Sequence, residues 1–325
     1  MGDTHQVRLA DGRAMAYADH GDPAGPVVLT CVGTPDSRLL EQRLVEVVEQ
    51  LGVRIVVPDR PGFGRSDPLP GRTLTGWPSD VAELMDALGV DRFAVVGGSG
   101  GGPYAVACGV LLADRVSAVA LLAPAAPRAA PAHGFVPRAE AALRSRGQRL
   151  AWLVNNDPEG LFAFLAPQES EPDRQAHATL RLQEKEEVLA NLREAFRQGT
   201  DAYVADHLIC ASDWGDLLPR LTRPTRIWQG THDNNVPAEA TRWLAERIPG
   251  ATLTLLPGAG HTLTPTRPGP RPTDGYSPPP RHNGAPVAGL PRDPRRVRPD
   301  RPPTPRPTHV RRQERASPRV ADHVL

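Results

Sequence analysis

One serine in this chain stands where a catalytic nucleophile would be expected. The apolar run from Phe93 to Val96 is followed directly by the pattern Gly-x-Ser-x-Gly, with Ser99 at its centre, and then by small residues that can open a helix. Strand, sharp turn and helix in this order form a nucleophile elbow, which presents a hydroxyl for attack on a carbonyl carbon. Gly97 and Gly101 would remove the Cβ atoms that collide in so tight a turn.

The other glycines of this segment are open to two interpretations. Gly98 completes the elbow, and Gly100 starts the helix, so that its N–H and the helix dipole would face negative charge developing beside the serine. The alternative is a glycine loop that cradles phosphate. Such a loop requires Lys followed by Ser or Thr after its last glycine, whereas this chain continues Pro103-Tyr104, so the elbow is favoured.

A serine nucleophile needs a base and an acid, and the sequence offers both just after two later apolar runs. Asp233 follows the run 226–230, and His261 follows the run 252–256. Loops beyond the carboxyl ends of parallel strands meet at one edge of a sheet, so Ser99, Asp233 and His261 can converge although they lie far apart in the chain. The order Ser, Asp, His is one of the known orders of such a triad.

The elements that must position these residues alternate between strand and helix. Residues 7–10 and 15–18 flank Asp11-Gly12 and predict a hairpin. The other predicted strands lie at 27–32, 53–57, 93–96, 116–122, 226–230 and 252–256, with helices to about residue 51, near 80–88, after residue 105 and near 237–247. The first of these helices carries its apolar residues on one face, at Leu40, Leu44, Val47, Val48 and Leu51. This alternation predicts an α/β fold, a mostly parallel sheet with helices on both faces.

Residues 125–213 interrupt this alternation, because they contain no run typical of a strand. They contain helical stripes instead, one of them at Val188, Leu189, Leu192 and Phe196, and an apolar cluster formed by Trp152, Leu153, Leu161, Phe162, Phe164 and Leu165. We interpret this segment as a helical cap inserted over the active site, and a helical extension packed only for stability is the alternative. The sheet domain then consists of residues 1–124 and 214–264.

Taken together, these motifs resemble the α/β-hydrolase fold of bacterial serine hydrolases with a helical cap. The resemblance covers about residues 7–261 and rests on the loop 58–66, on 97–101, on Asp233 with Val236-Pro237, and on Gly260-His261. It implies that Asp233 orients His261, that His261 takes the proton of Ser99, and that the amides of Thr34 and Gly100 hold the oxyanion. The chain departs from the family at Val32-Gly33, where His-Gly is usual, and in lacking a last helix after the histidine.

The chemistry implied is hydrolysis of an ester, amide or lactone bond in a small, largely apolar substrate, through an acyl-enzyme. We therefore expect a carboxylic-ester hydrolase that uses no metal and no cofactor. Two alternatives stay open, a cofactor-free perhydrolase with the same triad and a non-catalytic member of the fold that binds a small ligand. Dehalogenases and epoxide hydrolases with an aspartate nucleophile are excluded by the serine at the elbow.

Residues 265–325 differ in composition from the rest of the chain. These 61 residues hold 16 prolines and 13 arginines against 5 acidic residues, a net charge of +8, whereas residues 1–264 carry −7. Proline forbids a continuous helix, so we expect a disordered Pro- and Arg-rich tail, either genuine or the product of a shifted reading frame. Its charge predicts no specific nucleic-acid binding. Without a last helix, apolar surface would stay uncovered, and self-association into a homo-oligomer is an expected consequence.

The cysteine count and the N-terminal composition bear on the compartment. Cys31, Cys108 and Cys210 form no C-x-x-C pair, which favours buried, reduced thiols. The first residues lack the basic and apolar regions of a secretory signal, and no run approaches the length of a membrane span. These patterns predict a cytoplasmic protein without a membrane partner, whose partner is a small-molecule substrate.

Overall fold

The computed structural model describes residues 4–131 and 139–263. Eight strands form one sheet in the order β1-β2-β4-β3-β5-β6-β7-β8. The strands are β1 (Thr4–Arg8), β2 (Ala14–Gly21), β3 (Val27–Cys31), β4 (Arg54–Pro58), β5 (Phe93–Gly98), β6 (Val116–Leu122), β7 (Thr225–Gly230) and β8 (Thr252–Leu256). Every strand predicted from the sequence is present, within a few residues of its predicted bounds.

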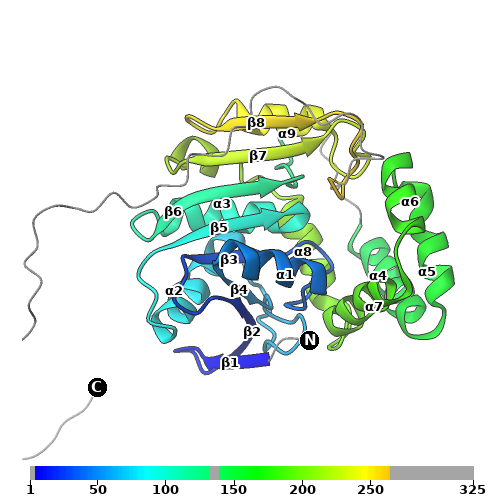
Figure 1. Cartoon of the computed structure of the whole chain (residues 1–325), viewed down its shortest axis with the longest axis horizontal. Coiled ribbons are helices and arrows are strands. Elements are labelled where there is room, and N and C mark those ends of the chain that lie inside the picture. Colours follow the sequence, from blue (N-terminus) through cyan, green and yellow to red (C-terminus); the bar gives the residue numbers. More distant parts are fainter. Residues whose placement is uncertain (1–3, 132–138, 264–325) are drawn as a thin grey trace, which may run out of the picture. The chain divides into compact units, whose positions relative to one another are not determined.

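Strand direction follows the connections between the strands. β1 and β2 pair antiparallel across a tight turn, where Gly12 adopts a φ of 89° that glycine accepts without strain, so the predicted hairpin is confirmed. β2 is antiparallel to β4 as well, and all other neighbours are parallel. The parallel strands therefore end together, and the loops that follow β3, β5, β7 and β8 meet at one edge of the sheet (Figure 1).

Helices cover the sheet on both faces, as predicted. The helix α1 (Gln42–Leu51) lies on one face, and α2 (Trp77–Ala87) and α3 (Gly102–Leu111) lie on the other (Figure 1). The helix α9 (Ala238–Ala245) packs on β7 and β8. The core between sheet and helices is almost solvent-free at its centre, where Leu29, Val95 and Leu121 are completely buried.

The orientation of α1 differs from the expected one. Val48 is buried against β2, where Gly21 leaves room for its methyl group. Leu44, Val47 and Leu51 form the stripe predicted from the sequence, but they are 45%, 49% and 68% exposed. The helix can bury only one side against the sheet, and no described residue covers the other side. Leu44, Val47 and Leu51 therefore form an apolar stripe on the surface of the described residues.

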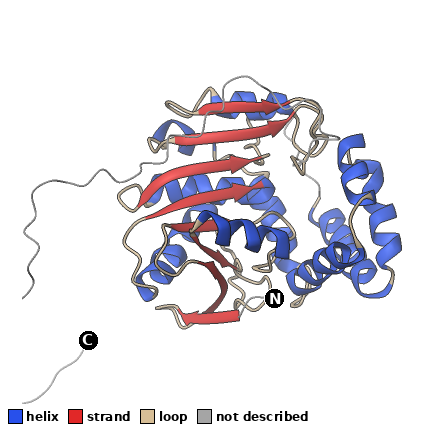
Figure 2. Cartoon of the chain, in the orientation of Figure 1, coloured by secondary structure: helices blue, strands red, loops and turns tan. Residues whose placement is uncertain are grey.

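A group of helices without strands follows β6. It consists of α4 (Glu140–Asn156), α5 (Pro158–Leu165), α6 (Glu171–Ala178), α7 (Leu182–Ala195) and α8 (Asp201–Cys210), and it lies beyond the carboxyl ends of the parallel strands (Figure 2). These helices enclose an apolar cluster of their own that includes Leu153, Leu161, Leu189 and Phe196. Trp152 was expected in this cluster, but it is 50% exposed, beneath the guanidinium of Arg149.

Three short 3-10 helices complete the connections outside the elbow, at Leu74–Gly76, Ala166–Gln168 and Gly215–Arg220. All described residues belong to one compact unit. The predicted tail at 265–325 lies outside the described residues, and the domain boundaries at 124, 213 and 264 stay predictions.

Within the part of the chain that the structure describes, no helix is long and apolar enough to cross a membrane, and all three cysteines are buried and free.

The orientation of α1 can be tested through the stability of single variants. We expect Leu44→Gln and Leu51→Gln to change the free energy of unfolding by at most about 0.5 kcal/mol each, because both side chains face solvent. Val48→Ala should lower it by about 1–3 kcal/mol, because it leaves a cavity against β2. Urea unfolding followed by circular dichroism measures all three. A larger loss at Leu51 than at Val48 would contradict this orientation.

Candidate active site

The turn at Ser99 has the geometry of a nucleophile elbow. Ser99 opens a 3-10 turn, Ser99–Gly101, between β5 and α3, and its φ of 49° lies in the left-handed region that side chains rarely adopt. A Cβ on Gly97 would lie 2.6 Å from the Cβ of Ala105, and one on Gly101 would lie 2.0 Å from the carbonyl oxygen of Cys31. These contacts explain why glycine stands at both positions. A Cβ on Gly98 would meet no atom within 4 Å, so the turn does not require glycine there.

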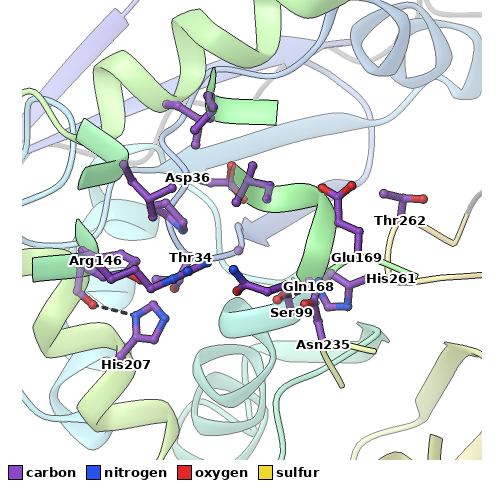
Figure 3. A pocket seen from close by; sticks show the side chains of 18 of the residues that line it. Thr34, Asp36, Ser99, Arg146, Gln168, Glu169, His207, Asn235, His261 and Thr262 are labelled. Carbon is purple, nitrogen blue, oxygen red and sulfur yellow. Dashed lines mark hydrogen bonds between the residues drawn. The ribbon is translucent and has the colours of Figure 1, made fainter. Parts of the chain in front are cut away.

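The structure brings the predicted nucleophile, base and acid together. His261, in the loop after β8, has its Nε2 2.9 Å from Oγ of Ser99 (Figure 3). Its Nδ1 lies 2.8 Å from Oδ2 of Asp233. This network assigns the proton to Nδ1, which donates to the carboxylate and leaves the Nε2 lone pair to accept from the serine hydroxyl. The three residues come from the ends of β5, β7 and β8, as the parallel sheet predicts.

Asp233 is held in place by donors from its own strand and loop. The amides of Asn235 and Val236 donate to its Oδ1 at 2.8 and 2.9 Å, and Nε2 of Gln229 donates to its Oδ2 at 2.9 Å. Gln229 is fixed in turn by the hydroxyl of Thr241, which donates to its amide oxygen at 2.7 Å. The carboxylate is therefore oriented toward His261 before any ligand arrives.

The two amides predicted to form an oxyanion hole lie side by side near Ser99. A Cβ on Gly100 would lie 2.6 Å from Oγ1 of Thr34 and 3.4 Å from its amide nitrogen, so only glycine lets the two segments approach this closely. The N–H of Thr34 has no acceptor in the described part of the chain. A free amide at this place can donate to negative charge on a substrate oxygen.

A buried carboxylate on α8 holds the loop that carries Thr34. Asp206 is completely buried, and its Oδ2 accepts the Thr34 hydroxyl at 2.7 Å. Arg60 donates to the same carboxylate oxygen and also to the carbonyl oxygens of Val32 and Gly33, at 2.6 and 2.7 Å. Carboxylate and guanidinium together fix both the side chain and the backbone of this loop.

The same carboxylate collects two further donors. The hydroxyl of Tyr104 on α3 donates to its Oδ1 at 2.7 Å, and Arg72 pairs with the same oxygen. Burial alone would raise the pKa of Asp206, but the charges of Arg60 and Arg72 and these hydrogen bonds outweigh it and hold the pKa below its usual range. Asp206 is therefore ionised at neutral pH and balances two buried guanidinium groups.

A second carboxylate, on α6, anchors the loop that carries His261. Asp173 is 1% exposed, and its two oxygens accept the backbone amides of His261 and Thr262, each at 2.9 Å. The hydroxyl of Ser170 donates to it at 2.6 Å. A Cβ on Gly260 would lie 2.3 Å from this carboxylate, so glycine is needed for the approach. A helix from the segment after β6 thus supports the backbone of the candidate base directly.

The electrostatic surroundings of His261 favour its protonated form. Burial lowers the pKa of the ring, but the hydrogen bond and charge of Asp233 outweigh burial, and Asp173 and Asp36 act in the same direction, so the net pKa is raised above its ordinary value. Asp36 lies nearby, and burial raises its pKa to about 6 although Arg60 and Asn191 oppose the shift.

Ser99 and His261 open into a cavity of about 750 Å³ beneath the helices after β6. Most of its wall is apolar, formed by Leu122, Leu143, Leu150, Val154, Leu161, Leu165, Leu192 and Phe196. Polar side chains reach into it from several elements, among them Arg146, Gln168 and His207 (Figure 3). The cavity is large enough for a small organic substrate.

The sequence predicted the residues that meet at Ser99, but it did not predict three others. Asp173 and Asp206 support the loops of the site, and Arg146 lines its cavity. Asp173 and Asp206 are single acidic residues in helices, and nothing local distinguishes them from solvated ones. Arg146 had a signal, because it stands three residues after Leu143 and four before Leu150 and so shares the apolar face of α4.

Comparison with known proteins agrees with the fold of this chain. Residues 26–268 match the family model of the α/β hydrolase fold. The chain belongs to the α/β-hydrolase family. This α/β hydrolase is 26% identical over 270 residues, 78% of its own length and 88% of the relative's, to 2-hydroxy-6-oxononadienedioate/2-hydroxy-6-oxononatrienedioate hydrolase 2 of Pseudomonas putida.

Solved structures of bacterial proteins have the same fold. An α/β hydrolase fold protein from Nakamurella multipartita matches with a TM-score of 0.60 and 26% identity, covering 80% of this chain and 92% of that one. A thermophilic esterase from Thermogutta terrifontis matches with a TM-score of 0.59 and 25% identity over the same shares of the two chains. The predicted family and fold class are confirmed.

The raised pKa of His261 in this α/β hydrolase predicts a pH-dependent contribution to stability. The folded state holds the proton to higher pH than the unfolded chain, whose histidines titrate near about 6.5. This stabilisation is fully present below the unfolded pKa and is lost as pH rises through the folded pKa. The unfolding free energy of the wild type minus that of His261→Gln should therefore fall as pH rises.

Urea unfolding of both proteins at a series of pH values from about 5 to 8.5 measures this difference, the interval being set by the ordinary histidine pKa. His232→Gln serves as the matched control, because His232 lies one residue from Asp233 but is exposed to solvent. Its difference from the wild type should not vary in the same way. A difference at His261 that grows with pH would contradict the raised pKa.

Proposed function

We propose that this α/β hydrolase is a carboxylic-ester hydrolase that acts through Ser99, His261 and Asp233 with an acyl-enzyme on Ser99. The observation that carries the proposal is the hydrogen-bonded line from Asp233 through His261 to Ser99, with distances of 2.8 and 2.9 Å. A nucleophile within hydrogen-bond distance of a base, and that base oriented by a buried acid, is the arrangement that acyl transfer requires.

Acylation begins when Oγ of Ser99 attacks the carbonyl carbon of the substrate and its proton moves to Nε2 of His261. The imidazolium that forms is stabilised by Asp233, and the negative carbonyl oxygen accepts hydrogen bonds from the amides of Thr34 and Gly100. Loss of one such donor usually costs about 10²- to 10³-fold in rate. Collapse of the tetrahedral intermediate breaks the ester bond, and the imidazolium returns its proton to the leaving alcohol.

Deacylation repeats these steps with water as the nucleophile. Nε2 of His261 takes a proton from the water as its oxygen attacks the acyl carbon on Ser99. The new tetrahedral intermediate then releases the carboxylic acid, and the proton returns to Oγ. Amides and lactones would react by the same route. The apolar wall of the cavity supports a small substrate whose carbon chain is largely apolar.

The relatives support hydrolysis in general, and the esterase from Thermogutta terrifontis supports ester chemistry. A perhydrolase would use the same acyl-enzyme with hydrogen peroxide in place of water. No feature of the described residues favours peroxide over water, and the ordered triad does not favour a merely ligand-binding role. The experiments below separate these alternatives.

Replacing the nucleophile should abolish the chemistry. We expect Ser99→Ala to lose labelling by a fluorophosphonate and to lose ester turnover by about 10³-fold or more, because no other hydroxyl lies in line with His261 among the described residues. Labelling followed by mass spectrometry and a panel of p-nitrophenyl esters measure both effects.

Ser212→Ala, at an exposed serine, is the control and should behave as the wild type. Wild-type labelling of Ser99→Ala would contradict the proposed nucleophile. A wild type that binds ligands but is neither labelled nor active would favour the binding role, and peracid formation that exceeds hydrolysis when peroxide is added would favour the perhydrolase.

Asp173 should act as a positioning residue for His261. In Asp173→Asn the side-chain nitrogen cannot accept the amide of His261 or Thr262, so we expect kcat to fall by about 10-fold or more. The negative charge of Asp173 raises the pKa of His261, so its removal should also move the acidic limb of the pH profile of kcat/KM to lower pH.

Glu171→Gln is the matched control, because Glu171 lies on the same helix but is exposed. It should change neither kcat nor the acidic limb. Asp173→Glu restores the charge without the geometry. It should therefore return the acidic limb of the pH profile toward its wild-type position more fully than it restores kcat. A profile of Asp173→Asn that coincides with the wild type at every pH would contradict the role of Asp173.

A further inference from the structure

One face of α4 lines the cavity with four side chains at helical spacing. Leu143, Leu150 and Val154 are buried and apolar, and Arg146 stands among them at a position where the pattern calls for another apolar residue. Figure 3 shows its side chain reaching into the pocket that Ser99 and His261 also line. An arginine in this stripe is exceptional, because a helix facing an apolar space normally keeps its charges on the opposite side.

The guanidinium of Arg146 has no anionic partner among the described residues. Its one recorded contact is with the ring of Phe164, whose centroid lies 5.1 Å from Cζ. Its neighbour Arg144, two residues earlier on the same helix, pairs with both Glu140 and Asp201. A half-buried charge without a partner is costly unless a ligand or another ion offsets it, and an aromatic contact offsets only part of that cost.

The carboxylates of the cavity wall are engaged elsewhere. Oδ1 of Asp36 accepts the side-chain amide of Asn191 at 2.7 Å, and Oε1 of Glu169 lies 2.9 Å from Nδ1 of His177, an ion-pair distance without hydrogen-bond alignment. Arg146 is the one lysine or arginine among the described residues that line the cavity. The wall therefore combines a long apolar surface with a single uncompensated cation.

We propose that Arg146 binds a carboxylate at the end of the substrate remote from the scissile bond, so that the preferred esters are half-esters of dicarboxylic acids. This inference rests on the proposed esterase function. The guanidinium fork matches a carboxylate in geometry and keeps its charge at any working pH. The apolar wall packs against the methylene chain between the two ends. Recognition of this kind also fixes which carbonyl of the substrate reaches Ser99.

The experiment compares three esters of similar length on the wild type: monoethyl adipate, ethyl heptanoate and the ethyl ester of aminocaproic acid. They end in a carboxylate, a methyl group and an ammonium group, and ethanol release measures kcat/KM for each. A second set of three such esters, with the longer carbon chain of suberate, tests which distance between the two ends of the substrate the site accepts. We expect the half-ester to be preferred over the neutral ester by about 10- to 100-fold, the range for a charge-assisted hydrogen bond in a partly buried site.

Arg146→Met should remove this preference, read as the ratio of kcat/KM for the half-ester to kcat/KM for the neutral ester on the same variant, so that any loss common to both esters cancels; methionine preserves the apolar packing. Arg146→Glu should reverse the preference toward the ammonium ester. Arg144→Met is the matched control, since it removes a paired arginine from the same helix, and it should leave the ratio of the two rates unchanged. The proposal is overturned if the ratio of kcat/KM for the half-ester to kcat/KM for the neutral ester is the same in the wild type and in Arg146→Met.

Binding separates failure of this proposal from failure of the esterase function. Calorimetry with adipate and with hexanediol, on the wild type and on Arg146→Met, needs no turnover. Adipate should bind the wild type about 10-fold or more tightly than it binds Arg146→Met, and hexanediol should bind both alike. If no ester is hydrolysed but this difference is seen, the site for the carboxylate stands and the proposed reaction is wrong. If esters are hydrolysed and adipate binds both proteins equally, the reaction stands and the role of Arg146 is wrong.

Discussion

The geometry of the site depends on one buried carboxylate and the two guanidinium groups around it. Asp206 is reached from three directions, by Arg60 after β4, by Arg72 before α2 and by Tyr104 on α3, and it holds the hydroxyl of Thr34 after β3. Removing one partner of a buried ion pair costs about 3–5 kcal/mol, since the remaining charge is left without compensation. The loops around Ser99 therefore keep their arrangement together or lose it together.

The parts of the molecule that follow from local rules could be predicted from the sequence. Strands of branched residues, the glycines at 97 and 101, and an acid and a base directly after two strands are all visible in short windows. Their convergence follows from parallel strands alone. The stripe on α1 was visible too, but its exposure was not, because burial of a helix face depends on what packs against it and not on the helix.

The supporting residues could not be predicted, for a physical reason that is the same in each case. Asp173 contacts His261 across 88 positions, and Asp206 contacts Thr34 across 172. The local sequence around an aspartate in a helix does not reveal such a distant partner, because the partner is determined by tertiary contacts alone. Gly260 gave the one indirect hint, because a glycine directly before a histidine leaves space for something to approach, although not for a particular residue.

The contact between Asp173 and the loop of His261 also bears on how this protein can evolve or be engineered. A design that treats the helices between β6 and β7 as an exchangeable module assigns specificity to the helices and chemistry to the sheet. Here the loop that carries His261 depends on a hydrogen-bond acceptor that α6 provides. A chimaera that grafts helices from a relative onto this sheet would have to carry an acidic residue at the matching place, together with the glycine that admits it. The helix α6 and the loop that carries His261 therefore have to be exchanged together.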